Sequence, residues 1–178
     1  MKKKSIRKLV RKKISIILLL GMMTNIIFAD IKLNPNSKQN TTIDRSQNNA
    51  ATIININTPN ERGISVNEFN EFQTKDPVIF NNFGEGIGRS YLAGLMAANP
   101  NLSREQAAQL ILNRVGGNNR VEIENYLEVM SNGKTDVVFS SPNGYYLNNI
   151  GFINFRDVAF TTANVNLDAN GDLMPFNV

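Results

Sequence analysis

Short runs of β-branched and aromatic residues recur along the chain, and glycine, asparagine or proline separates most of them. In one run, Ile64 and Val66 alternate with polar residues, which is the period of a strand with one buried face. The runs that predict strands lie at 52–57, 63–72, 78–81, 110–115, 121–130, 135–140, 151–155 and 158–162. Many short strands with turn signals roughly 10 residues apart predict an all-β sandwich, barrel or solenoid.

Three further segments are less regular. Residues 147–150 form either another strand or one arm of a protruding hairpin. Residues 103–109 hold good helix formers and a capping-box pattern, with Gln106 three residues after Ser103, so we expect one helical turn that leads into the strand at 110–115. The glycines in 84–89 lack the third glycine and the later acidic residue of a dinucleotide-binding loop, and they predict a glycine-rich turn.

Two turn sequences are the most specific signals in the chain. In each, a proline restricts φ to the range that a turn requires, and the asparagine that follows tolerates a left-handed backbone. They therefore predict tight turns rather than catalytic loops. The two sequences are Asn99-Pro100-Asn101-Leu102 and Ser141-Pro142-Asn143-Gly144.

The N-terminal segment, 1–29, differs from the rest of the chain. Residues 1–13 hold eight basic residues and no acid, residues 14–28 are mostly apolar, and Ala29 follows them. This order predicts a secretory signal peptide at 1–29. A membrane anchor is the alternative, but the interrupted apolar stretch is shorter than the ~20 residues that span a bilayer. Residues 30–51 are polar and predict an exposed N-terminal arm, or cap, with one strand.

The charge of the chain depends on that first segment. The whole chain carries 19 basic and 15 acidic side chains, and removing the eight basic residues of 1–13 leaves 11 against 15. The remainder therefore has a net charge near −4. A nucleic-acid-binding domain needs a basic face, so we expect no nucleic-acid partner.

Cysteine and histidine are both absent. Their absence excludes disulfides, thiol nucleophiles, Ser-His dyads, and zinc sites built on sulfur or imidazole. We expect no cofactor and no metal site, and only a carboxylate-based enzyme would remain conceivable.

Asparagine is heavily over-used throughout the chain. Scattered asparagines indicate turns, whereas asparagines at matching points of successive coils stack as a side-chain ladder. The spacing fits either interpretation at Asn55, Asn57, Asn81, Asn113 and Asn154.

Taken together, these residues resemble the N-terminal secretion domain of two-partner-secretion (TPS) exoproteins, the filamentous haemagglutinin family. The resemblance covers about residue 53 to the C-terminus, and the two turn sequences match the family motifs Asn-Pro-Asn-Leu and Asn-Pro-Asn-Gly-Ile in order. The chain departs from the second motif at Ser141, where the family usually has asparagine, and at Tyr145, where it has isoleucine. Supporting residues are Asn57, Pro59, Asn60, Gly151, Phe152 and Asn154.

The resemblance implies a right-handed parallel β-helix with an N-terminal cap and extra-helical hairpins. On that basis residues 52–178 form the β-helix domain, and we expect it to be incomplete because the family continues with further coils. Coils of a solenoid bury their apolar faces only by stacking, and its ends need caps. Residues 99–102 and 141–144 would each shape a hairpin.

The resemblance also implies a function, the secretion signal of an adhesin-type exoprotein. After export through the inner membrane, such a domain is recognised in the periplasm by an outer-membrane transporter of the Omp85 type, through its POTRA domains. We expect a secreted or cell-surface protein of a Gram-negative bacterium, without a stable membrane span. The two turn sequences would either contact the transporter or only form turns that folding requires.

Two other classes of function stay open. Haemagglutinin relatives bind host surfaces, so host glycans or receptors are alternative partners. A β-helix polysaccharide-degrading enzyme would need clustered carboxylates. Glu122, Glu124 and Glu128 lie close in sequence, but no matching acid or basic partner accompanies them. They favour a solvated acidic edge, and we expect no catalytic residues.

Overall fold

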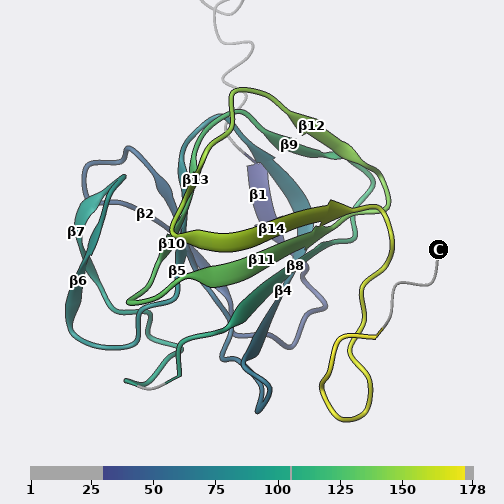
Figure 1. Cartoon of the computed structure of the whole chain (residues 1–178). Helices are drawn as coiled ribbons and strands as arrows, with labels where there is room; N and C mark the ends of the chain where they lie inside the picture. Colours follow the sequence, from purple (N-terminus) through teal and green to yellow (C-terminus); the bar gives the residue numbers. More distant parts are fainter. Residues whose placement is uncertain (1–29, 105, 175–178) are drawn as a thin grey trace, which may run out of the picture.

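A computed structural model describes residues 30–104 and 106–174 (Figure 1). All regular secondary structure in this part of the chain is β-strand. The all-β prediction is therefore confirmed. The strands are β1 (Asp30–Leu33), β2 (Thr42–Arg45), β3 (Thr52–Asn55), β4 (Ile64–Thr74), β5 (Val78–Asn81), β6 (Ile87–Ser90), β7 (Gly94–Ala97), β8 (Leu110–Val115), β9 (Val121–Ile123), β10 (Leu127–Met130), β11 (Thr135–Ser140), β12 (Tyr145–Leu147), β13 (Phe152–Ile153) and β14 (Phe155–Thr161).

The strands wind into coils that stack in parallel, and the coils have three faces (Figure 1). On the first face β3, β5, β10 and β13 pair in that order. On the second face the start of β4 pairs with β8, followed by β11 and β14. On the third face the end of β4 pairs with β9, which pairs with β12. This arrangement is a parallel β-helix, as predicted.

The length of chain in one coil is nearly constant. Thr52 pairs with Val78 in the next coil, and Leu127 pairs with Phe152 after almost the same number of positions. Val78 and Leu127, which also pair, are almost twice as far apart in sequence because the second coil carries an insertion between β5 and β8. Constant register places inward-facing positions of successive coils above one another, so their apolar side chains meet.

The insertion forms an antiparallel hairpin of β6 and β7 outside the β-helix (Figure 1). Its inner face packs on the outside of the first face, where Met96 joins Ile79 and Met130 in a buried cluster. The predicted extra-helical hairpin is thus present, and the glycine-rich segment 84–89 supplies part of strand β6 as well as a turn.

The N-terminal arm contains two strands where one is expected. β1 pairs antiparallel with β4, and β2 pairs antiparallel with β3. Ile31 and Leu33 anchor β1, and Ile43 alone anchors β2, because all three pack against the core. A single apolar residue in a polar segment, as in β2, leaves no periodic signal, which is why a second strand is not expected there.

Residues 162–174 leave the end of β14 and form a loop beside the second face (yellow in Figure 1). Val165 is buried there against Ile64, Val66 and Leu112, and Leu167 forms an isolated bridge with Leu173. The segment therefore covers the outer side of the second face where β4, β8 and β11 carry outward hydrophobic residues.

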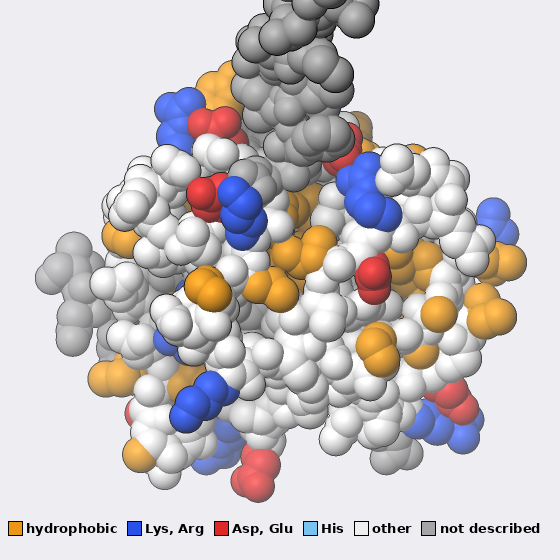
Figure 2. All heavy atoms as spheres, turned by 180° about the vertical axis from the view of Figure 1, so that it is seen from behind, with side chains coloured by type: hydrophobic (Ala, Val, Ile, Leu, Met, Phe, Trp, Pro, Cys, Tyr) orange, Lys and Arg blue, Asp and Glu red, His pale blue; other side chains and the backbone are white. Residues whose placement is uncertain are grey.

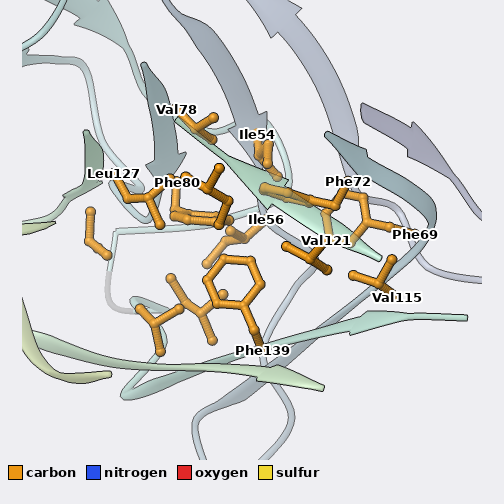
Figure 3. Close-up of a cluster of buried hydrophobic side chains, with 14 of the residues drawn as sticks. Ile54, Ile56, Phe69, Phe72, Val78, Phe80, Val115, Val121, Leu127 and Phe139 are labelled. Atoms are coloured by element: carbon orange, nitrogen blue, oxygen red, sulfur yellow. The ribbon is translucent and has the colours of Figure 1, made fainter. Parts of the chain in front are cut away.

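The interior of the β-helix is filled by aliphatic and phenylalanine side chains (Figure 3). Phe139 is fully buried at its centre, and its ring makes edge contacts with Phe72 and Phe80 at centroid distances of 5.3 and 6.0 Å. Its register partner in the next coil, Phe160, stacks on it at 5.1 Å. Aromatic contacts thus join successive coils through the core.

The predicted helical turn at 103–109 is wrong for the residues described there. The capping contact forms, since Ser103 N donates to Gln106 Oε1 at 3.1 Å, but no helix follows. Instead, the buried Asn82 side chain binds both backbone groups of Ala108, accepting from its N–H at 2.7 Å and donating to its carbonyl at 2.9 Å. This tertiary contact fixes the backbone of Ala108 just before β8 and overrides local propensity.

Two strand boundaries also differ from prediction. The single run at 121–130 is two strands, β9 and β10, because the chain turns from the third face to the first at Glu124–Tyr126, where Asn125 Nδ2 donates to Lys75 O. Residues 151–162 bend at Asn154, whose φ is +63°, between β13 and β14. The undecided segment 147–150 contributes only Leu147 to a strand, which pairs in parallel rather than as a hairpin.

On the face shown in Figure 2, charged side chains are dispersed rather than gathered into one patch. Many form exposed ion pairs, such as Arg62 with Asp172 and Arg104 with Glu85. Within residues 30–104 and 106–174, no helix is long and apolar enough to cross a bilayer. The predicted signal peptide lies outside the described residues.

Candidate functional site

The first turn sequence forms a buried corner at the end of the inserted segment. Asn99 is 1% exposed, and its Nδ2 donates to the carbonyl oxygens of Ile56 and Asn81 at 3.0 and 2.8 Å. Its Oδ1 accepts from Asn101 N at 2.9 Å, and its carbonyl accepts from Leu102 N at 3.1 Å. Asn99 therefore joins the ends of β3 and β5 and closes its own turn.

The neighbours of Asn99 extend this clamp. Asn101 Nδ2 donates to Asn40 O at 2.7 Å and to Ile56 O at 3.1 Å, which ties the N-terminal arm to the first coil. Leu102 is buried in the main core, whereas Pro100 is exposed. Three of the four residues thus contact other parts of the fold.

The second turn sequence forms the corner between β11 and β12. Ser141 is fully buried, and its carbonyl accepts from Gly144 N at 3.2 Å. Its hydroxyl has no hydrogen-bond partner among the described residues. Pro142 and Asn143 are exposed, and Asn143 Nδ2 donates to Gly117 O in the corner of the preceding coil. The corners of two successive coils are thus joined by a hydrogen bond.

The prediction that the second turn sequence shapes a hairpin is wrong, whereas the first lies at the base of the β6–β7 hairpin, where Asn99 N donates to Phe83 O at 2.8 Å. The strands on either side of 141–144, β11 and β12, pair with different neighbours, and the first corner joins β7 to the path toward β8. Among the turn residues, only Gly144 has a left-handed backbone, with φ of +78°, so neither Asn101 nor Asn143 uses its tolerance for that conformation. Both sequences are corners of the β-helix.

Tyr145, which departs from the family pattern, reinforces the second corner. Its hydroxyl donates toward the carbonyl oxygens of Thr161 and Phe139, which lie at 2.6 and 2.9 Å. Its ring packs edge-on against Phe160 at 5.3 Å. Burial raises the pKa of Tyr145 to about 12, from an ordinary value of 10.0.

The supporting residues Asn57, Pro59 and Asn60 lie in the corner between β3 and β4. Asn57 Oδ1 accepts from Asn40 N at 3.2 Å. Asn60 Oδ1 accepts from Ile64 N at 3.0 Å and its Nδ2 donates to Gly171 O at 2.9 Å. These side chains connect the first coil to both the N-terminal arm and the segment 162–174.

The other supporting residues lie at the start of the last described coil. Gly151 packs against the ring of Tyr126, since a Cβ there would lie 2.3 Å from a ring carbon. Phe152 is 39% exposed and contacts Phe155 at a centroid distance of 5.2 Å. Asn154 makes the left-handed bend described above.

Glu128 is an unusual residue whose position the sequence does not reveal. It is fully buried on the outer side of β10, and its carboxylate accepts from Ser90 Oγ at 2.7 Å, Tyr91 N at 2.8 Å and Leu92 N at 3.0 Å. These donors form the tip of the β6–β7 hairpin. A buried charge is stable only when hydrogen bonds replace its hydration, and the hairpin tip supplies them.

The predicted solvated acidic edge is therefore wrong at Glu128. The other two carboxylates each have a basic neighbour, Glu122 with Arg120 at 3.0 Å and Glu124 with Lys75 at 3.6 Å. In the part of the chain described, no group of three or more Asp and Glu side chains could hold a metal ion.

The asparagine ladder is limited to one step. Asn81 Nδ2 donates to Asn55 Oδ1, its register partner, at 2.9 Å. Asn113 is in register with Asn67, but neither amide atom of Asn113 has a partner among the described residues. Asn57 and Asn154 serve turns instead.

Comparison with known proteins gives three results. Residues 29–178 match the family described as the TPS secretion domain. The "16S rRNA endonuclease CdiA" of Enterobacter cloacae is 38% identical over 140 residues, which is 78% of this chain and 4% of that protein. The "tRNA nuclease CdiA" of Yersinia mollaretii is 36% identical over 140 residues, or 78% of this chain and 5% of that protein. The chain thus spans a small fraction of these relatives.

Among solved structures, the crystal structure of the filamentous hemagglutinin secretion domain is similar to this chain. The TM-score is 0.66 with 27% sequence identity, and the match covers 78% of this chain and 44% of that one. The likeness extends over most of the stacked coils rather than over one motif.

We predict that the two corners respond differently to alanine. Asn99→Ala should lower the free energy of unfolding by about 2–4 kcal/mol, because the carbonyl oxygen of Asn81 loses this donor, the carbonyl oxygen of Ile56 keeps only Asn101, and Asn101 N loses its acceptor. Ser141→Ala should change it by less than about 0.5 kcal/mol, because the lost hydroxyl has no partner. Urea unfolding followed by circular dichroism measures both, and equal effects would contradict the distinction.

We predict that Glu128→Gln loosens the hairpin, because an amide NH₂ would replace one oxygen that faces N–H and O–H donors. The free energy of unfolding should fall by about 2–3 kcal/mol, and the amides of Tyr91 and Leu92 should exchange with solvent faster. Glu124→Gln is the matched control and should cost less than about 1 kcal/mol, because its ion pair is exposed. Unchanged exchange at the hairpin tip would contradict this role.

We predict a late alkaline transition from Tyr145. Since the folded state holds the phenol proton more tightly than the unfolded state, the resulting stabilisation is complete below pH 10 and disappears as pH rises toward 12. Absorbance titration of the phenolate band should show one phenol ionising at about pH 12, and Tyr145→Phe should remove that step. The same late step in the variant would assign it to another tyrosine.

Proposed function

The chain belongs to the TPS secretion domain family, and we propose that it is the secretion signal that an outer-membrane transporter recognises to export an exoprotein. Recognition takes place in the periplasm and involves the POTRA domains of an Omp85-type transporter. The chain then serves as the first folded coils on which further β-helix can form. The domain serves secretion rather than catalysis.

The observation that carries this proposal is the parallel stack of coils that matches a known secretion domain. Family members are exported to the surface of Gram-negative bacteria or secreted by them. The predicted signal peptide at 1–29 would direct passage through the inner membrane first. The nuclease activities in the names of the CdiA relatives belong to proteins far longer than this chain.

The two corner motifs act mainly through the fold in this proposal. Asn99 and Ser141 are buried and inaccessible to a partner, and Asn101 is engaged by the N-terminal arm. Pro100 and Asn143 are exposed, so a direct transporter contact at the corners would involve these two residues. Loss of export after substitution of Asn101 would therefore accompany loss of stability.

Binding to the transporter tests the proposal. The purified chain should form a saturable complex with the periplasmic region of its cognate transporter, measured by isothermal titration calorimetry. In cells, Asn101→Ala should reduce export of the exoprotein and lower the thermal midpoint of the purified chain together.

The proposal would be overturned if the purified native chain did not bind the periplasmic region although cells still exported the exoprotein. The control is Asn132→Ala in the exposed loop between β10 and β11, which should leave binding, export and stability unchanged. A matching loss in this control would show that the assay does not report recognition.

A further inference from the structure

Strand β2 has a free outer edge. It lies at the end of the five-stranded sheet and, among the described strands, pairs with β3 alone. Ser46 N donates to Ala51 O at 3.0 Å and so closes this antiparallel pair. Because hydrogen-bonded pairs alternate along an antiparallel ladder, the backbone N–H and C=O of Ile43 and Arg45 point away from β3. These groups can accept a further strand.

Two hollows open on either side of this edge. The outer hollow, of about 400 Å³, lies between the β2–β3 pair and β7, and its lining includes Asp44, Ile53 and Leu95. The inner hollow, of about 690 Å³, is lined in part by Ile31 and Ile43. Side chains of an added strand would point alternately to the two faces of the sheet, and therefore alternately toward the two hollows.

The two hollows share Asp44 and Arg45 and differ in their other lining residues. In the outer hollow, Asp44 accepts from Asn55 Nδ2 at 3.2 Å and forms no ion pair with a described residue. The nearby Arg45 is already engaged, since its guanidinium binds Thr52 at 2.9 Å and Asp76 at 2.8 Å. The outer hollow therefore presents an uncompensated carboxylate beside an apolar wall, which suits the aliphatic stem and charged end of lysine. The inner hollow has Ile31 and Ile43 as its apolar residues, and its other lining residues are polar or charged: Asp44, Arg45, Asn49, Thr52 and Asp76.

We propose that the free edge of β2 is the strand-addition site for an extended segment of the transporter's periplasmic region that alternates basic and apolar side chains. The site rests on the function proposed above and gives recognition a location on this chain. Backbone hydrogen bonds to Ile43 and Arg45 supply affinity, while a basic side chain beside Asp44 and an apolar one beside Ile43 select the segment. The net charge near −4 of residues 30–178 favours a basic partner.

The hairpin surface beside the outer hollow adds apolar area to this site. Leu95 and Ile87 are 69% and 74% exposed, and hydrophobic side chains are numerous on the side of the molecule that carries the hairpin (right in Figure 2). Leu95 is common to the hairpin surface and the outer hollow. A segment paired with β2 would therefore find an apolar border on its outer side.

A pair of substitutions at one position tests the edge. Ile43→Pro removes an N–H from the open side of an edge strand, where proline is tolerated, whereas Ile43→Ala removes the same side chain and keeps the N–H. Binding of the full chain to the periplasmic region should weaken about tenfold more in the proline variant than in the alanine variant. Circular dichroism should show that both variants keep the β-sheet spectrum.

Asp44→Asn tests the charge in the outer hollow. It should weaken binding severalfold and reduce the dependence of binding on salt concentration, whereas Asp157→Asn, at an exposed position of β14, should do neither. Because the chain has no cysteine, a single Thr42→Cys substitution also allows a photo-crosslinker to be placed beside the edge. It should capture the periplasmic region.

The outcomes separate the site from the function. Equal binding by Ile43→Pro and Ile43→Ala, with a native chain that binds, would overturn the site and leave the secretion function intact. No binding by the native chain would overturn both. A concentration-dependent dimer of the native chain that Ile43→Pro abolishes, with transporter binding unchanged, would assign the edge to a second copy of this chain and overturn the proposal.

Discussion

Parallel pairing between successive coils is the interaction on which the rest of the structure depends. A single coil cannot bury its own apolar face, so each strand must find its partner in the coil above or below. The near-constant length of chain between paired strands brings Phe139 against Phe160 and sets the corners above one another. Segments that do not fit this repeat, the β6–β7 hairpin and residues 162–174, lie outside the coils and cover their outer faces.

The strands of the coils could largely be predicted from the sequence because their signals are local. Residues 78–81 and 135–140 are β-branched or aromatic runs bounded by turn residues, and both are strands. The failures depend on distant contacts. Asn82 binds the backbone of Ala108, where the sequence predicts a helical turn. Glu128 is buried by a hairpin tip that is 36 to 38 residues away in sequence. No pattern within a short window of sequence contains that information.

The two corners show what a motif does and does not determine. Their proline and asparagine residues correctly predict turns, because proline restricts φ wherever it occurs. What each turn joins depends on the coils: the hairpin expected at 141–144 is a corner instead, while 99–102 closes the base of the β6–β7 hairpin. The similar sequences also differ in hydrogen bonding: Asn99 satisfies two buried carbonyl groups, whereas Ser141 is too short to do so and leaves its own hydroxyl without a partner among the described residues. Tyr145 stabilises the same corner instead, because its hydroxyl donates to the carbonyl oxygen of Thr161 in β14.

The carboxylate of Glu128 links the hairpin to the order in which the chain becomes available. The hairpin belongs to the second coil, but its acceptor arrives with the third, so a polypeptide delivered from its amino end holds an unfinished loop until β10 has docked. The hydrogen bonds that fix the hairpin tip therefore form only after the third coil is in place. If the chain emerges from its amino end, the β6–β7 hairpin would be the last part of the second coil to become rigid.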